Sequence, residues 1–355
     1  MKRVGRLWDD LVSFDNLLLA FQKARKGKRR RKDVARFEFS LETELLDLQS
    51  ALISGHYRPG SYRLFTVYER KPRQIAAASF RDRVIHHALL NVVEPWLDRR
   101  FIDDNYACRR ERGVHRAVDR YQVWAQRYAY VMKLDVASYF PSLNHQILKA
   151  QLRRHIKDRQ VLNLFDQIID GSPLNSASSL VYFSGDDLFS PLEERCGIPI
   201  GNLTSQFLGN LYLNEVDHFI KQSLCSRAYL RYVDDLFLLS DSKAQLHAWR
   251  HAIEQRLIPL RLRIHPRKAQ VFQVSEGVDV LGYRVFPSYR LLRNENGHRF
   301  SRRLRRFAAG YRAGELDWVD FNPSVQSWIG HAAHADTKGL RKTLFDSTVF
   351  TRELG

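Results

Sequence analysis

The stretch RYVDDLFLLS, residues 231–240, places two adjacent aspartates, Asp234 and Asp235, inside an otherwise apolar run. An unpaired ionised carboxylate that is removed from water costs several kcal/mol. The pair therefore indicates either a tight turn that returns both carboxylates to water or a bound cation. The apolar residues on both sides, AYLRY before and DLFLLS after, predict two strands joined by that turn.

A third carboxylate lies in a similar setting. The segment YAYVMKLDVASYFPSL, residues 128–143, predicts a buried strand that ends at Asp135 and turns before Pro141. Two neighbouring strands of one sheet would bring the three aspartates together. Clustered carboxylates suit hard divalent cations, and two Mg²⁺ ions can activate a hydroxyl and stabilise a leaving pyrophosphate. The alternative is a hairpin turn whose two aspartates face solvent.

The charge of the chain bears on this choice. The 355 residues include 57 Lys and Arg against 39 Asp and Glu, a net charge of +18. Such a field favours a polyanionic partner, and nucleic acid is the leading candidate. Ribosomal and chromatin proteins share this property, so charge indicates a partner class and no activity. In KARKGKRRRK, residues 23–32, eight of ten residues are cationic, which predicts phosphate binding or a solvated loop.

The cysteines and the hydropathy indicate the compartment. Cys108, Cys196 and Cys225 are far apart and lack metal-ligand spacing, so we expect reduced thiols. No stretch approaches the roughly 18 apolar residues that span a bilayer, and the N-terminus lacks the pattern of a signal peptide. These features predict a cytoplasmic protein.

The remaining pattern predicts a mixed α/β (α+β) fold. Apolar spacing predicts an N-terminal helix over 7–21, and residues 61–78 predict two strands around ERKPRQ. Ser79 and Asp82 have the spacing of a helix cap, so a helix begins there. Residues 171–197 are rich in Ser, Gly and Pro and predict a surface excursion. Helices are expected after Gly201 and in the Arg-rich region beyond residue 289.

Several segments resemble the reverse transcriptases in the same order along the chain, roughly from residue 50 to 335. Tyr232-Val233-Asp234-Asp235 resembles their YxDD signature, and LDVASYF, residues 134–140, resembles their first palm motif. Four further segments are similar to fingers, template-contact, helical and primer-grip motifs: KPRQI with FRDRVIHHAL, NYACRRERG, GIPIGNLTSQFLGNLYLNEVDHF and VLGYRVFP. The resemblance implies a right-hand polymerase. Its expected parts are a basic N-terminal helical extension (1–50), fingers (51–130), a palm (131–288, excursion 171–197) and a short helical thumb (289–355).

One departure resembles a particular branch of that family. In IGNLTSQ, residues 200–206, Ile200 stands where glutamine is common and Gln206 where proline is common. This pattern, together with SWIGHAAHADT at 327–337, is similar to the reverse transcriptases of diversity-generating retroelements, which are encoded by bacteria and phages. The resemblance implies low-fidelity copying of a template-repeat RNA into cDNA, with errors at adenines, for mutagenic retrohoming. It also implies a small basic oligomeric accessory protein as a partner.

The resemblance also implies roles for individual residues. Asp135 and Asp234 would bind two Mg²⁺ ions with the Val136 carbonyl, and Asp235 would be the weaker carboxylate. The amides of Ser138 and Tyr139 would hold the triphosphate. The Phe140 ring would exclude a 2′-hydroxyl and so select dNTPs.

Further residues are expected around the nucleotide and the duplex. Lys71 and Arg73 would close over the phosphates, and Lys268 would protonate the leaving pyrophosphate. The nascent base pair would meet Ile200, Gly201 and Gln206. The template and primer would contact a larger set, made up of Arg109, Tyr232, Gly282, Tyr283, Arg302, Arg303 and Arg306.

Two alternatives differ in kind. Another bacterial reverse transcriptase, of the group II intron or retron type, shares the motifs. However, the chain is expected to end after the thumb, without a maturase, endonuclease or RNase H domain, and it lacks the Val-Thr-Gly tripeptide of retrons. A non-catalytic RNA-binding scaffold on the same fold is the other alternative. The intact Asp135, Asp234 and Asp235 argue against that scaffold.

Overall fold

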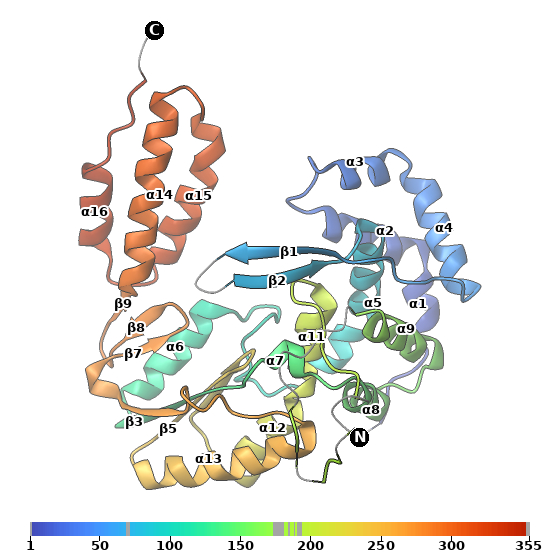
Figure 1. Cartoon of the computed structure of the whole chain (residues 1–355), viewed down its shortest axis with the longest axis horizontal. Coiled ribbons are helices and arrows are strands. Elements are labelled where there is room, and N and C mark those ends of the chain that lie inside the picture. Colours follow the sequence, from blue (N-terminus) through green and yellow to red (C-terminus); the bar gives the residue numbers. More distant parts are fainter. Residues whose placement is uncertain are drawn as a thin grey trace.

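The computed structural model of the protein describes residues 2–68, 72–172, 181–183, 185–187, 189 and 194–352. A four-stranded antiparallel sheet lies between the helices α6 (Val114–Ala125) and α13 (Lys243–Leu257) (Figure 1). Its strands run in the order β4-β5-β3-β6. They are β4 (Tyr229–Tyr232), β5 (Asp235–Ser240), β3 (Tyr130–Asp135) and β6 (Gln270–Gln273). The predicted strand-turn-strand around Asp234 and the predicted strand ending at Asp135 are both confirmed, and β3 and β5 are neighbours.

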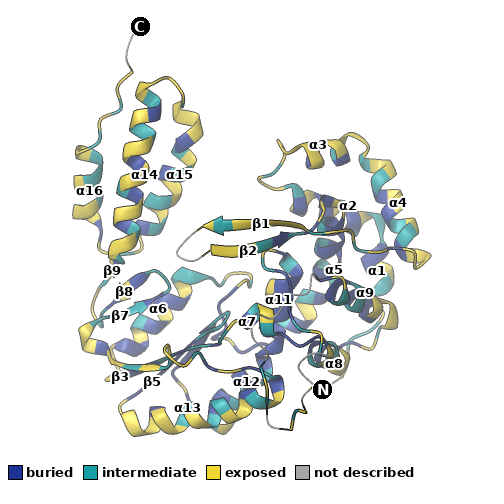
Figure 2. Ribbon diagram, viewed as in Figure 1, coloured by how far each residue is buried: buried dark blue, intermediate teal, exposed yellow. Residues whose placement is uncertain are grey.

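Both faces of this sheet are covered, which explains its continuous apolar runs. Alternate residues face opposite sides of a strand. Met132 and Leu236 belong to the largest buried cluster, which contains residues of α5 and α11, whereas Val131 and Phe237 pack in a second cluster with α6. Figure 2 shows the buried residues gathered in these strands and in the helices around them.

The N-terminal region is a layer of helices packed around one long helix. These are α1 (Trp8–Val12), α2 (Phe14–Arg25), α3 (Lys32–Phe39) and α4 (Leu41–Ile53), around α5 (Phe80–Asp98). The prediction of one continuous helix over 7–21 is wrong. Ser13 has φ −59° and ψ 142°, and its hydroxyl accepts the Asn16 N–H at 3.3 Å, so α1 ends and α2 begins there.

The predicted pair of strands and the helix after it are confirmed. Strands β1 (Arg63–Tyr68) and β2 (Pro72–Ala77) pair in antiparallel register, and Lys71 lies outside the described residues. The Ser79 hydroxyl accepts the Asp82 N–H at 3.1 Å and caps α5. Farther along the chain lie α6 (Val114–Ala125), α7 (Tyr139–Ser142), α8 (His145–His155), α9 (Arg159–Asp170), α11 (Leu203–Tyr212), α12 (Asn214–His218) and α13 (Lys243–Leu257).

Part of the expected surface excursion is described. Its residues 173–180, 184, 188 and 190–193 lie outside the described residues. The Asp186 carboxylate accepts two hydrogen bonds from the Arg261 guanidinium, at 2.8 and 2.9 Å, which ties this segment to the turn that follows α13.

The C-terminal region adds a second sheet and a separate group of helices. The sheet contains β7 (Val278–Val280), β8 (Tyr283–Val285) and β9 (Arg290–Leu292). The helices α14 (Asn294–Arg312), α15 (Trp318–Ala332) and α16 (Lys338–Asp346) project beyond it (Figure 1). They have their own small core of Phe300, Leu304, Phe321 and Val325.

Two further observations concern the surface. No helix in the described part of the chain is long and apolar enough to cross a membrane, and the three cysteines are free thiols.

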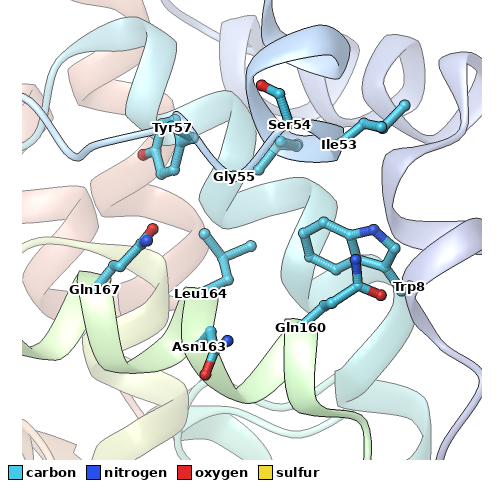
Figure 3. A pocket seen from close by; sticks show the side chains of 10 residues that line it. Trp8, Ile53, Ser54, Gly55, Tyr57, Gln160, Asn163, Leu164 and Gln167 are labelled. Carbon is cyan, nitrogen blue, oxygen red and sulfur yellow. The ribbon is translucent and has the colours of Figure 1, made fainter.

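A pocket of about 220 Å³ lies between the end of α4 and α9. Trp8, Gln160, Asn163 and Gln167 line it (Figure 3), and it contains none of the residues predicted to act in catalysis.

The buried His86 on α5 makes stability depend on pH. Neither of its ring nitrogens has a hydrogen-bond partner among the described residues, and burial lowers its pKa to about 4. In the unfolded chain His86 is protonated below about pH 6.5, whereas in the folded protein it is protonated only below about pH 4. We expect the free energy of unfolding to fall across this interval, with His86 contributing up to about 3 kcal/mol.

The measurement is chemical unfolding of wild type and His86→Leu at pH 7.0 and 4.5. The variant should lose less stability on acidification. His247→Leu, at an exposed position on α13, is the control and should match the wild-type dependence. Equal pH dependence in His86→Leu would contradict the role of His86.

Candidate active site

Three carboxylates meet where β3 ends and β5 begins. The register sets Asp135 opposite Asp235, and the Val136 N–H donates to the Asp234 carbonyl at 3.2 Å. Val233, in the turn between β4 and β5, has φ +57°. The sheet thus brings together the three aspartates that the sequence predicted.

Burial and like charges make ionisation of this cluster unfavourable. Burial raises the pKa of Asp234 to about 6, and the charges of Asp235 and Asp135 add to the effect. Burial also raises the pKa of Asp235, against the Lys133 ammonium 4.0 Å from its carboxylate. Like charges in a partly desolvated place favour a positively charged ligand.

A lysine neutralises part of this charge. The chain from 263 to 268 runs beside Asp135, where the His265 N–H donates to the Asp135 carbonyl at 2.7 Å. This contact brings the half-exposed Lys268 to 2.6 Å from the Asp135 carboxylate. Among the described residues, no group of three His, Cys, Asp or Glu side chains is arranged to hold a metal ion. Asp135 and Asp234 are the residues that could hold one if Lys268 moved aside.

The segment after Asp135 forms a turn beside the cluster. Ser138 is exposed and has φ +47°, in the left-handed region. Tyr139 is buried, and its hydroxyl donates to the Gly209 carbonyl on α11. Phe140 is half-buried against the same glycine, where an added Cβ would lie 3.2 Å from its ring. A side chain at residue 209 would therefore displace the Phe140 ring.

The segment around Ile200 is fastened to the β1–β2 hairpin. The Ala76 N–H donates to the Ile200 carbonyl at 3.3 Å. The buried Asn202 amide accepts the Ala78 N–H at 3.2 Å and donates to the Ala76 carbonyl at 2.9 Å. Gly201 has φ +107°, and an added Cβ would approach Ile75 to 2.9 Å. The predicted Ile200 and Gly201 therefore lie beside the strand that carries the exposed Arg73, and Gln206 is exposed on α11.

Two residues predicted to contact the template or primer are held inside the protein. The Arg109 side chain is 6% exposed and donates to the Asp98 carboxylate at 2.5 Å and to the Ile102 carbonyl at 2.7 Å. Tyr283 is fully buried, and its hydroxyl donates to the His331 carbonyl at 2.8 Å. The polar groups of both side chains are bound within the protein, and contact of Arg109 and Tyr283 with the template or primer stays a prediction.

The other template and primer candidates are spread over a wider surface. Tyr232, next to the turn, is half-buried, and Gly282 has φ +98° in the turn between β7 and β8. Arg302, Arg303 and Arg306 are exposed on α14. The arginines thus belong to the separate C-terminal helices and do not line the carboxylate cluster.

The sequence interpretation missed a buried network behind the turn. Arg231 and Asp217 are both fully buried, with guanidinium and carboxylate 2.7 Å apart. Arg231 also donates to the Val233 carbonyl at 2.9 Å and to the Asn210 carbonyl at 3.0 Å. The sequence did contain a sign of this network, because an arginine inside the apolar segment AYLRYV requires a buried acidic partner.

Comparison with known proteins agrees with the geometry of the carboxylates. Residues 66–285 match the family described as reverse transcriptase (RNA-dependent DNA polymerase), and this span contains β3, β4, β5 and all three aspartates. The chain belongs to the reverse transcriptase family. Membership makes RNA-directed DNA synthesis, with a nucleic-acid template and dNTP substrates, the general activity to which this site relates.

Individual relatives within the curated proteins are distant. Protein YkfC of Escherichia coli K12 is 27% identical over 285 residues, covering 69% of this chain and 72% of that protein. The group II intron-encoded protein LtrA of Lactococcus lactis is 22% identical over 184 residues, 51% of this chain and 29% of LtrA. Nuclear intron maturase 1 of Arabidopsis thaliana is 28% identical over 108 residues, 30% of this chain and 15% of the maturase. The chain therefore matches less than a third of the length of these last two proteins.

The raised pKa of Asp234 predicts a stabilising substitution. Its folded pKa of about 6 lies above the unfolded value, so the ionised carboxylate destabilises the fold above pH 6. Asp234→Asn should raise the free energy of unfolding by about 1–3 kcal/mol at pH 8 in EDTA, and the gain should shrink toward pH 4.

Thermal and chemical unfolding at the two pH values would measure the effect. The exposed Asp346→Asn provides a control that should change stability by less than about 0.5 kcal/mol. A less stable Asp234→Asn protein at pH 8 would contradict the assignment of charge repulsion to this cluster.

Proposed function

We propose that the protein is an RNA-directed DNA polymerase whose reaction centre is the cluster of Asp135, Asp234 and Asp235. The observation that carries the proposal is the pairing of Asp135 with Asp235 across β3 and β5, with Asp234 in the adjoining turn. Family membership supports the same reading. On this proposal the central sheet belongs to a palm (131–288). Residues 51–130 form the fingers, 289–355 a thumb, and 1–50 a basic extension.

The donor set suits two Mg²⁺ ions. Carboxylate oxygens are the ligands that hard divalent cations prefer. A cation would also relieve the repulsion that raises the pKa of Asp234. We assign Asp135 and Asp234, with the Val136 carbonyl, as ligands and Asp235 as the weaker carboxylate. When bound, the metal ions supply charge neutralisation at the attacking hydroxyl and at the leaving pyrophosphate.

The residues around the cluster then acquire roles toward the nucleotide. The amides of Ser138 and Tyr139 hold the triphosphate in the left-handed turn. The Phe140 ring, held against Gly209, excludes a ribose 2′-hydroxyl. Lys268 leaves Asp135 and donates a proton to the departing pyrophosphate.

The β1–β2 hairpin and the C-terminal helices contribute cations. Arg73 lies exposed on β2 and, with Lys71, closes over the phosphates of the nucleotide. Arg302, Arg303 and Arg306 on α14 bind phosphates of the template–primer duplex, which gives affinity without sequence reading. Tyr232 and Gly282 contact the primer. Arg109 and Tyr283 belong to the segments that meet the template and primer, and their internal hydrogen bonds hold those segments in place.

Within the family we propose the retroelement branch that copies a template-repeat RNA with errors at adenines. Ile200 and Gln206 support it, because they replace the commoner glutamine and proline. Ile200 offers only apolar contact beside β2, so a mispaired nucleotide loses less binding than it would beside a hydrogen-bonding glutamine. A small basic accessory protein would then be a partner.

A group II intron-type reverse transcriptase is the second candidate. The similarity to LtrA and to the nuclear intron maturase favours it. The two candidates differ in fidelity, and the error spectrum of the product separates them.

Primer extension tests the polymerase proposal. Purified protein with Mg²⁺ and dNTPs should extend a DNA primer on an RNA template that contains all four bases. Asp135→Ala and Asp234→Ala should each reduce the rate by at least about 10³-fold, because each removes a ligand of the reacting centre. The exposed Asp346→Ala is the control. Undiminished extension by Asp234→Ala would refute the proposed centre.

Sequencing of the cDNA tests the branch. Wild type should misincorporate mainly at template adenines, and Ile200→Gln should lower that error by up to about tenfold, equivalent to about 1.4 kcal/mol of discrimination. Ile200→Leu keeps an apolar side chain and should retain the wild-type spectrum. Equal spectra for wild type and Ile200→Gln would contradict the role of Ile200, and accurate wild-type synthesis would favour the second candidate.

A further inference from the structure

The network behind the catalytic turn is built around one fully buried cation. Arg231 has no solvent exposure, and neither has Asp217. The Arg231 guanidinium donates three hydrogen bonds of 2.7–3.0 Å to both carboxylate oxygens of Asp217. The Tyr229 hydroxyl donates to the same carboxylate at 2.6 Å. The charges are therefore paired and fully hydrogen-bonded, as buried charges must be.

The same guanidinium reaches the turn that carries Asp234. Its second terminal nitrogen donates to the Val233 carbonyl at 2.9 Å and to the Asn210 side-chain oxygen at 3.3 Å. The Val233 carbonyl belongs to the peptide whose nitrogen is that of Asp234. This hydrogen bond therefore fixes the plane of the Val233–Asp234 peptide, and that plane sets the direction in which the Asp234 side chain points.

The turn needs such a restraint. Val233 is β-branched and has φ +57°, a left-handed conformation that is strained for an L-residue. Because Val233 would relax toward a negative φ if it were free, the hydrogen bond from Arg231 opposes a change that would re-aim Asp234.

The network is also anchored on the far side. The backbone N–H of Arg231 donates to the Asp104 carbonyl at 2.9 Å, and the backbone carbonyl of Arg231 accepts the Tyr106 N–H at 3.0 Å. The Asn210 amide donates to the Ala107 carbonyl at 2.7 Å. The guanidinium is thus a fixed point that links β4, α11 and α12 to the turn.

Stability alone does not account for this arrangement. Apolar residues of similar volume often replace a buried ion pair without loss of stability, whereas no apolar side chain can donate to the Val233 carbonyl. We propose that Arg231 is a positioning residue that holds the Val233–Asp234 peptide so that Asp234 and Asp135 present their carboxylates to the same divalent cation. The inference rests on the proposed function, in which these two carboxylates bind the cation.

The test uses Arg231→Met combined with Asp217→Leu, which removes both buried charges and keeps the volume. Binding of Mn²⁺, followed by electron paramagnetic resonance on the full chain without nucleotide, should weaken by about tenfold or more, as is usual when a residue that orients a metal ligand is lost. The Mg²⁺ concentration for half-maximal primer extension should rise by a similar factor. Chemical unfolding reports whether the double variant is folded.

Tyr229→Phe is the matched control. It removes a hydrogen bond to the same Asp217 carboxylate but leaves the bond from Arg231 to Val233 in place. A purely structural role of the network predicts that the control and the double variant alter stability while Mn²⁺ affinity stays unchanged in both. The positioning role predicts weaker Mn²⁺ binding in the double variant and wild-type binding in Tyr229→Phe.

Arg231→Lys covers the case in which the double variant does not fold. Lysine keeps the charge, but its single ammonium cannot serve Asp217, Asn210 and Val233 together. It should weaken Mn²⁺ binding in folded protein.

Wild-type Mn²⁺ affinity and Mg²⁺ requirement in the folded variants would overturn the inference. Wild-type protein that binds Mn²⁺ without extending primers would refute the proposed function alone, whereas no Mn²⁺ binding by wild type would overturn both.

Discussion

The antiparallel register between β3 and β5 is the constraint on which the rest of the structure depends. It sets Asp135 opposite Asp235 and so brings like charges together where β3 ends and β5 begins, in an otherwise apolar sheet. A slip of one residue would turn every side chain of β3 to the opposite face and separate the carboxylates. The two buried clusters prevent that slip, because alternate residues of each strand already fill one cluster or the other.

The remaining parts of the site are attached to this register by a few polar contacts. Asn202 fastens β2 to the start of α11, Gly209 on α11 receives Tyr139 and Phe140, and Asn210 on the same helix meets Arg231. Helix α11 therefore contacts the hairpin, the turn after β3 and strand β4. Its small and amide side chains make these close approaches possible, since a larger residue at 209 would displace the Phe140 ring.

Much of this arrangement could be predicted from the sequence, and the exceptions have physical causes. The apolar runs around Asp135 and Asp234 predicted the strands, and the charge of +18 indicated the partner class. The N-terminal helix was predicted as one because its apolar spacing continues through Ser13, where a local hydroxyl bond ends it. Arg109 and Tyr283 were predicted at the template and primer, and the motifs did not reveal that their side chains are also bound internally. Arg231 was overlooked because its partner Asp217 is distant in sequence and only the fold joins them.

The C-terminal helices have a consequence for how the molecule unfolds. Among the described residues, their core contains four buried apolar residues, compared with the far larger clusters around the central sheet. A unit with so little buried surface opens at a lower free energy than the sheet does, and it can do so while the sheet stays intact. Amide hydrogens of α14–α16 should accordingly exchange with solvent before those of β3 and β5.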